Sequence, residues 1–343
     1  MRVLGSGIDT LEASFTGTLH PALASEVEYM KQAAQESDVP HLLDLAGCRF
    51  AVSGQGVKPW RWLLKGEDFH LRLSPSKSIP TASVRLLAIG LARLGHEECW
   101  HRASQAALAC GDVRHTSLSR LDLHADVQGF EPDAEVMEGF VCPATDDSVY
   151  RSARKVQTFT YGRGEIVVRI YNKTAELAAS GKGWMRDVWA TCDEYRPEEP
   201  VWRIEYQLRR AYLRQVGVQT VEDAFGRLDD LWVSGLDWGD LRIPKGINTS
   251  RWEPHPAWEQ LRALSPCGVI VPRIPATKSN ATFEQMVPQV VGLLVSGGAA
   301  LGLPDLDTML AVTKRQAQRY LDGRGVTFAA LVEQRARERF GSG

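Results

Sequence analysis

The chain has 343 residues, of which 44% are hydrophobic, so it can bury a large core and its length suggests two or three domains. Its formal net charge of -2 gives no overall nucleic-acid signal, which means that basic surface has to be sought segment by segment. No stretch approaches the ~20 apolar residues of a membrane span, and the N-terminus lacks the layout of a signal peptide. We therefore expect a cytoplasmic protein without a membrane partner.

The first 215 residues alternate between strand and helix patterns. Residues 7–19 alternate as a strand does, and residues 20–37 carry apolar side chains at helical spacing. This order predicts an α+β fold with an antiparallel or mixed sheet and helices on one face. The remaining expected elements are β-rich stretches over 49–76 and 82–95, a helix over 96–111 closed by Gly111, a strand over 117–129, a helix over 133–142, a strand pair over 157–173 and a strand over 200–210.

Beyond residue 215 the pattern is mostly helical. A proline-rich passage at about 266–280 is the best linker candidate. The expected organisation is a first domain at 1–215, a helical extension with the linker at 216–280, and a helical module at 281–340. Residues 311–343 contain seven Lys or Arg against three acids, so the C-terminal end is basic.

Three predicted strands each place polar residues on one face. Side chains two residues apart in a strand share a face. One explanation of this pattern is an antiparallel sheet with one face in water. The polar sets are Arg120, Asp122, His124 and Asp126; Arg169, Tyr171 and Lys173; and Arg203, Glu205, Gln207 and Arg209.

The residue types also suggest a metal site. Strands are depleted in aspartate, and a face with Asp122, His124 and Asp126 in a row repels itself unless a cation lies there. Carboxylate-led ligand sets suit Mg²⁺ or Mn²⁺, and His124 tilts the choice slightly toward manganese.

A tyrosine beside such a site can act as a nucleophile. A phenol has a reference pKa of ~10 and is a poor nucleophile at neutral pH, but nearby positive charge favours its phenolate. Arg169, Lys173 and a metal could supply that charge next to Tyr171. The same cations would stabilise a phosphate under attack, and a covalent phosphotyrosine would keep the energy of the broken ester for rejoining.

At these three strands the sequence resembles the replication initiation factors of rolling-circle plasmids, filamentous phages and integrative elements, the group that includes the staphylococcal plasmid Rep proteins. The ordered motifs R-L-D-L-H-A-D, R-I-Y-N-K-T-A-E and W-R-I-E-Y-Q-L carry the resemblance. It covers about 115–212, and residues 7–17 fit the family's first strand more loosely.

The resemblance implies a nickase-type catalytic domain that cuts and rejoins DNA with a metal, using Tyr171 as the nucleophile. Asp122, Asp126 and Glu205 match the family's acidic positions and are the metal candidates. His124 stands where the family often carries a small or apolar residue, so it is either an added ligand or a polar surface residue. The chain has no His-hydrophobic-His strand of the larger class of tyrosine nickases, so metal binding would rest mainly on carboxylates.

The implied reaction is a transesterification at a single-stranded or extruded origin site. Tyr171 attacks a metal-polarised phosphate and leaves a 5′-phosphotyrosyl protein and a free 3′-hydroxyl. We expect Arg169, Lys173 and Arg203 to orient or neutralise the phosphate. Glu176 would hold Lys173 in place or act as a base.

The C-terminal segment 306–340 is similar to an AraC-type helix-turn-helix, although it has one such unit where these regulators usually carry two. The similarity places a turn at 311–313 and a basic helix at 314–321 that Thr313 caps. The alternative is a basic amphipathic helix packed on the core. In the first case the residues that contact phosphates and base edges are Lys314, Arg315, Gln316, Gln318 and Arg319.

DNA is therefore the expected partner, as a single-stranded origin site with flanking duplex. The family also suggests a host helicase and dimerisation, and nothing in this sequence shows either. Two rival functions remain: a DNA-binding regulator of a mobile element that does not cut, and a metal-dependent nuclease that uses water. The presence of the tyrosine and all the acids favours the nick-and-join enzyme.

Overall fold

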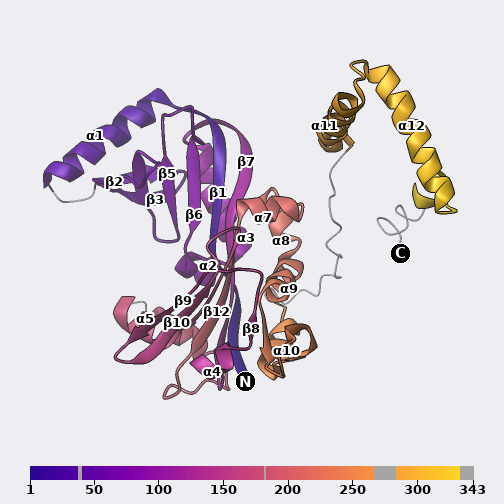
Figure 1. Cartoon of the computed structure of the whole chain (residues 1–343). Helices are drawn as coiled ribbons and strands as arrows, with labels where there is room; N and C mark the ends of the chain where they lie inside the picture. The colour runs from indigo at the N-terminus through magenta and orange to yellow at the C-terminus, as the bar shows by residue number, and fades with distance from the viewer. Residues whose placement is uncertain (38–40, 181–182, 266–282, 333–343) are drawn as a thin grey trace. The chain divides into compact units, whose positions relative to one another are not determined.

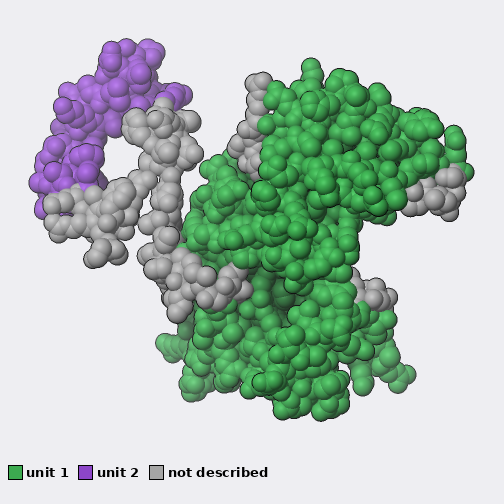
Figure 2. Space-filling view, turned by 180° about the vertical axis from the view of Figure 1, so that it is seen from behind, with its two compact units in different colours: residues 1–274 green, residues 275–343 purple. Residues whose placement is uncertain are grey.

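The computed structural model describes residues 1–37, 41–180, 183–265 and 283–332. The chain forms two compact units, 1–274 and 275–343 (Figure 2). The helices between residues 216 and 265 belong to the first unit, because α8 (Val221–Phe225) and α9 (Leu228–Trp238) pack on strands of its sheet.

An 11-stranded sheet organises the first unit, and all of its neighbouring strands are antiparallel (Figure 1). The strand order is β2-β3-β4-β5-β6-β1-β7-β12-β11-β10-β9. The strands are β1 (Arg2–Leu19), β2 (His41–Leu45), β3 (Cys48–Val52), β4 (Trp62–Lys65), β5 (Phe69–Leu73), β6 (Ala82–Leu86), β7 (Gly111–Gln128), β9 (Asp147–Ser152), β10 (Lys155–Tyr161), β11 (Ile166–Asn172) and β12 (Trp202–Arg209).

The two halves of the sheet share one connectivity. Each begins with an 18-residue strand, β1 or β7, that lies at the centre of the sheet. The chain then passes through a helix to the sheet edge, at β2 or β9, and returns strand by strand until β6 pairs with β1 and β12 pairs with β7. The long central pair therefore joins the two halves into one sheet.

Helices cover the apolar face of the sheet, as the sequence pattern predicts. Ala13, Val84 and Leu71 are aligned across β1, β6 and β5 and are fully buried. α3 (His96–Leu108) packs on β5, β6 and β7, α1 (Pro21–Ser37) packs on β2 to β4, and α7 (Arg210–Gln215) packs on β7 and β12. Figure 1 shows α7, α8, α9 and α10 (Pro256–Arg262) following one another along one side of the sheet.

Smaller elements border the sheet. The helices α2 (Ala88–Leu94) and α5 (Lys173–Ser180) contact β1 and β12 respectively. A 3-stranded sheet is made of β8 (Phe140–Val141), β13 (Asp240–Ile243) and β14 (Glu253–Pro254). The other short helices are α4 (Ala134–Met137), α6 (Trp184–Trp189) and a 3₁₀ turn at Thr249–Arg251.

Several boundaries differ from the sequence prediction. The β-rich stretch 82–95 ends as α2, and the helix expected over 133–142 stops at Met137 and continues as β8. The helix closed by Gly111 ends earlier, and Gly111 instead begins β7. β9 was missed because all six of its residues are exposed, so it lacks the alternation that marks a strand. The predicted linker at 266–280 lies outside the described residues.

The described part of the second unit consists of α11 (Phe283–Leu301) and α12 (Leu306–Gly323), with a further helical stretch beginning at Phe328. The turn predicted at 311–313 is wrong, because α12 runs through it without a break. The Thr313 hydroxyl donates to the Met309 carbonyl one turn earlier instead of capping a helix, and Asp305 provides the N-cap. The turn between the two helices lies at 302–305.

No single helix of the described ranges is long and apolar enough to cross a membrane. The pair Val290–Leu301 and Leu306–Gly323 reaches that length and composition only together, with a bend of 93° between them.

Candidate active site on the polar face of the sheet

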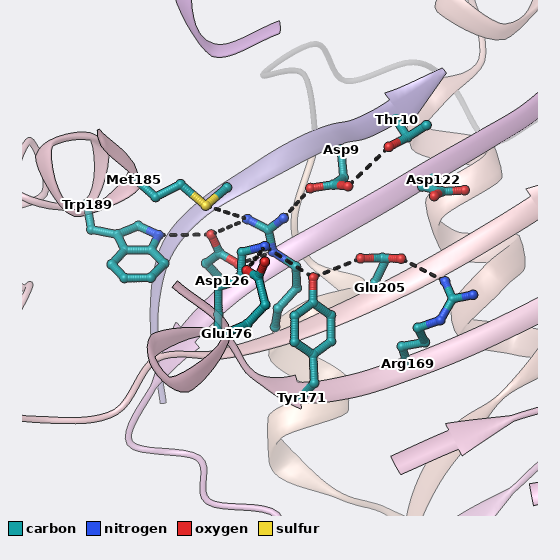
Figure 3. A network of polar contacts seen from close by, with 12 residues as sticks. Asp9, Thr10, Asp122, Asp126, Arg169, Tyr171, Glu176, Met185, Trp189 and Glu205 are labelled. Carbon is teal, nitrogen blue, oxygen red and sulfur yellow. Dashed lines mark hydrogen bonds and ion pairs between the residues drawn. The ribbon is translucent and has the colours of Figure 1, made fainter. Parts of the chain in front are cut away.

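The strands β7, β12 and β11 bring most of the predicted site residues together (Figure 3). Because side chains at aligned positions of an antiparallel sheet share a face, the strand register sets which groups meet. Three successive rows cross these strands: Asp126, Arg203 and Tyr171; His124, Glu205 and Arg169; and Asp122 and Gln207.

The junction between β11 and α5 positions Lys173 and Glu176. Asn172 ends the strand, and its side-chain oxygen accepts a hydrogen bond of 3.0 Å from the Ala175 amide, which is the N-cap arrangement favoured by asparagine. Lys173 and Glu176 then lie three residues apart in the first turn of the helix and form an ion pair of 2.8 Å. The helix start therefore turns the Lys173 ammonium back toward Tyr171.

The Tyr171 hydroxyl lies between an acceptor and a cation. It donates a hydrogen bond of 3.0 Å to Glu205 Oε2 and accepts one of 3.3 Å from Lys173 Nζ. The Lys173 side chain is buried, whereas Tyr171 is half-buried. A hydroxyl with a carboxylate to take its proton and an ammonium to stabilise the resulting anion is arranged for nucleophilic attack.

The expectation that neighbouring cations favour the Tyr171 phenolate is wrong for the free protein. Burial and then the charge of Glu205 raise the pKa of Tyr171 well above its ordinary value, against the lowering effect of Arg203. Arg169 does not contact the phenol and instead donates to Glu205 Oε1 at 2.9 Å and to Gln207 Oε1 at 2.8 Å. The phenol is therefore protonated at neutral pH, and Glu205 is the group that can accept its proton.

Arg203 was predicted to contact DNA, but it is completely buried. Its Nε and Nη2 donate to the two carboxylate oxygens of Asp126 at 2.6 and 2.7 Å, and its Nη1 donates to Asp9. Asp126 Oδ2 also accepts from the Trp189 indole at 2.9 Å. Burial would raise the pKa of Asp126, but Arg203 outweighs it and holds that pKa below the ordinary value. Arg203 and Asp126 therefore form a buried ion pair with each other.

Asp9 belongs to this network, and the sequence prediction missed it. The register between β1 and β7 shifts between Ile8 and Thr10, so Asp9 is the extra residue of a β-bulge. A bulge redirects the side chain of its extra residue, which is how Asp9 reaches Arg203. Strict alternation along β1 places Asp9 on the same face as Leu11, which is in the apolar core. The only sign of this role in the sequence was an acidic residue within the predicted first strand, in the segment Gly7–Ile8–Asp9.

Asp122 and Glu205 are carboxylates on the polar face whose charges interact. Among the described residues no three His, Cys, Asp or Glu are grouped as a complete metal cage. Mg²⁺, however, is usually held by one or two carboxylates together with waters and substrate phosphates. Burial raises the pKa of Asp122 to about 7, against the lowering effect of its hydrogen bond from Arg120, and the charge of Glu205 adds to the rise. A cation between the two carboxylates would relieve this repulsion.

The polar face continues beyond the site as a cross-strand row of mostly basic residues, in which burial and then the charges of Arg85 and Lys65 lower the pKa of His70. One line of aligned residues crosses six strands from β12 to β4: Arg209, Arg120, Glu12, Arg85, His70 and Lys65. Glu12 is the single acid of the row, and it also pairs with Arg72 at 2.8 Å. Like charges that lie directly opposite each other destabilise a sheet. The row, hereafter the basic row, is therefore a surface that a polyanion would stabilise.

The predicted DNA-binding residues of the second unit, Lys314, Arg315, Gln318 and Arg319, all lie on α12 and are exposed. Residues four apart in a helix are neighbours, so Lys314 with Gln318 and Arg315 with Arg319 form adjacent pairs on its surface. Gln318 also donates to Asp322 at 2.8 Å. These side chains are free of the core and can contact a ligand.

The buried Arg203 ion pairs predict a large loss of stability in Arg203→Ala. Removing one partner of a buried ion pair leaves uncompensated charge and costs about 3–5 kcal/mol. We expect urea to unfold this variant at a clearly lower concentration than the wild type. Arg49→Ala, which removes an ion pair with Asp44 in which both side chains are exposed, should unfold near the wild type. Equal midpoints for both variants would contradict the role given to Arg203.

Two comparisons with known proteins find similar chains. No family model matches the chain. The uncharacterized protein ORF430 of Pseudomonas phage Pf1 is 26% identical over 300 residues, which span 74% of this chain and 66% of the phage protein, slightly under two thirds of its length. Among solved structures, a rolling circle replication initiator protein from Geobacillus stearothermophilus is similar with a TM-score of 0.46 and 14% identity, covering 76% of this chain and 98% of that one.

Proposed function

We propose that this chain is a rolling-circle replication initiator that nicks and rejoins single-stranded origin DNA, with Tyr171 as its nucleophile. The observation that carries the proposal is the Tyr171 hydroxyl held between Glu205 and Lys173. The three ordered sequence motifs and the basic row support the same function. The similarity to a phage protein fits a mobile genetic element.

The proposed reaction begins with a proton transfer. The phenol proton passes to Glu205 Oε2 as the Tyr171 oxygen attacks the phosphorus. The new bond joins that oxygen to the phosphorus, the bond from phosphorus to the 3′ oxygen breaks, and the leaving oxygen takes up a proton from solvent. Lys173 stabilises the negative charge on the phenol oxygen, and Glu176 holds Lys173 in place. Rejoining reverses these steps.

Asp122 and Glu205 would hold Mg²⁺ or Mn²⁺ together with phosphate oxygens of the DNA. The bound cation would polarise the scissile phosphate as a Lewis acid. Arg169 lies beside Glu205 with about a third of its side chain exposed, so it can both fix that carboxylate and approach the phosphate. Arg203 does not touch the scissile phosphate in this scheme and instead keeps β7 and β12 in register.

DNA binding is assigned to two surfaces. The basic row would bind the strand that leads to Tyr171, because it continues the same face of the sheet. The exposed α12 residues Lys314, Arg315 and Arg319 would bind flanking duplex through its phosphates, with Gln318 available for a base edge. A host helicase and a homodimer remain further expectations from the family resemblance.

Tyr171→Phe should abolish covalent capture of DNA. The wild type, incubated with Mn²⁺ or Mg²⁺ and a labelled single strand from the origin of its own element, should give an adduct that survives a denaturing gel. Tyr150→Phe removes an exposed tyrosine on β9 and should form as much adduct as the wild type. Cleavage without an adduct would indicate a hydrolytic nuclease, and binding without cleavage would indicate a regulator.

Glu205→Gln should slow adduct formation by about 10²–10⁴-fold, because loss of a general base costs a factor of this size. The amide keeps the shape of the side chain but cannot take the Tyr171 proton. The rate is measured under single-turnover conditions, with Glu165→Gln, an exposed glutamate immediately before β11, as the control. A Glu205→Gln rate equal to that of the control would remove Glu205 from the mechanism.

The double variant Lys65→Ala/Arg85→Ala should weaken binding of single-stranded DNA and reduce its salt dependence. Each lost phosphate contact lowers the slope of log affinity against log salt by about 0.7 for a single strand. The slope is obtained from fluorescence anisotropy over a range of salt concentrations. Lys245→Ala/Arg251→Ala removes two exposed cations of the first unit outside the row and should leave the slope unchanged. Equal slopes in both double variants would contradict the assignment of the basic row.

A further inference from the structure

A cavity of about 360 Å³ opens on the polar face beside the Arg203 network. Its existence depends on two glycines of β1. Gly5 and Gly7 are aligned with Asp126 and His124 of β7, and all four residues line the cavity. A side chain at Gly5 would find open space here, since a Cβ on Gly5 meets no atom within 4 Å.

The cavity walls are apolar and partly aromatic. α2 contributes Ala88, Leu91 and Ala92, and α6 contributes Trp184 and Val188. Trp184 is half-buried and packs beside a small apolar cluster, while Val188 and Ala92 are exposed at the surface. An indole next to small apolar side chains offers a flat surface on which an aromatic ligand can stack.

His124 supplies a polar group without a partner. Its Nδ1 is buried, and no hydrogen bond reaches it from the described residues. An imidazole nitrogen can donate or accept a hydrogen bond, which suits the edge of a nucleobase. Asp126 and Arg203 also line the cavity, and they already form hydrogen bonds with each other.

We propose that this cavity is a base pocket, formed by Gly5, Gly7, Ala92, His124 and Trp184, that holds one unpaired nucleobase of the strand that Tyr171 cuts. The proposal rests on the proposed function for its choice of ligand. Arg203 joins the two sites, because it lines the pocket and is aligned with Tyr171 across β12 and β11. The base stacks on Trp184 and its edge faces His124. Holding a base here fixes the neighbouring phosphate relative to the nucleophile.

The test uses photochemical crosslinking of the full chain without a divalent cation. The probes are random single strands of about 15 nucleotides. In each pool one base is replaced by its photoreactive analogue: 5-iodouracil, 5-iodocytosine, 8-bromoadenine or 8-bromoguanine. We expect at least one pool to crosslink to Trp184 or His124, as located by peptide mass spectrometry.

Two variants fill the pocket. Gly5→Leu adds a side chain where the backbone leaves open space, and Ala92→Phe adds an exposed ring at the cavity edge, so folding does not depend on either change. Both should reduce the pocket crosslink at least about tenfold, in line with the stacking energy of a single base. Gly164→Leu adds the same bulk at a position outside the pocket and should keep the crosslink. Absence of any crosslink to the pocket, or its persistence in both filled variants, would overturn the proposal.

This test is independent of strand cutting. A pocket crosslink in a protein that forms no Tyr171 adduct would support the base pocket and reject the nick-and-join function. An adduct at Tyr171 without a pocket crosslink would support the nick-and-join function and reject the base pocket.

Discussion

The buried guanidinium of Arg203 is the interaction on which the site depends. It carries a full charge in the interior, where a charge is tolerated only with close counter-charges. Asp126 from β7 and Asp9 from β1 supply them, so one side chain of β12 ties three strands together. Because Tyr171 is aligned with Arg203 on the next strand, this tie also fixes the strand that carries the proposed nucleophile.

The same network separates two environments on one face of the sheet. On one side, Glu205, Lys173 and Arg169 surround or support the Tyr171 hydroxyl with groups that move or stabilise a proton. On the other side, Gly5 and Gly7 leave a cavity with apolar walls. Both are built on strands, which hold side chains more precisely than loops do. The sheet thus places the Tyr171 site and a pocket with mostly apolar walls on either side of the Arg203 network.

Much of this arrangement follows from residue alternation in the sequence. The period of two along 120–127, 167–173 and 201–209 predicted which side chains share the polar face, and the register brings them into adjacent rows. Alternation cannot tell which charged groups pair, and that is why Arg203 was assigned to DNA and Glu205 only to metal. It also fails at a β-bulge, so Asp9 was missed. Trp189 comes from a helix whose packing the local pattern does not show.

The central claim is that Tyr171 becomes covalently linked to DNA. The most direct measurement is mass spectrometry of the protein after reaction with an origin strand and complete nuclease digestion. The account predicts one peptide with a nucleotide mass attached at Tyr171. Attachment at another tyrosine, such as Tyr161 or Tyr195, or an unmodified chain alongside cleaved DNA, would contradict it.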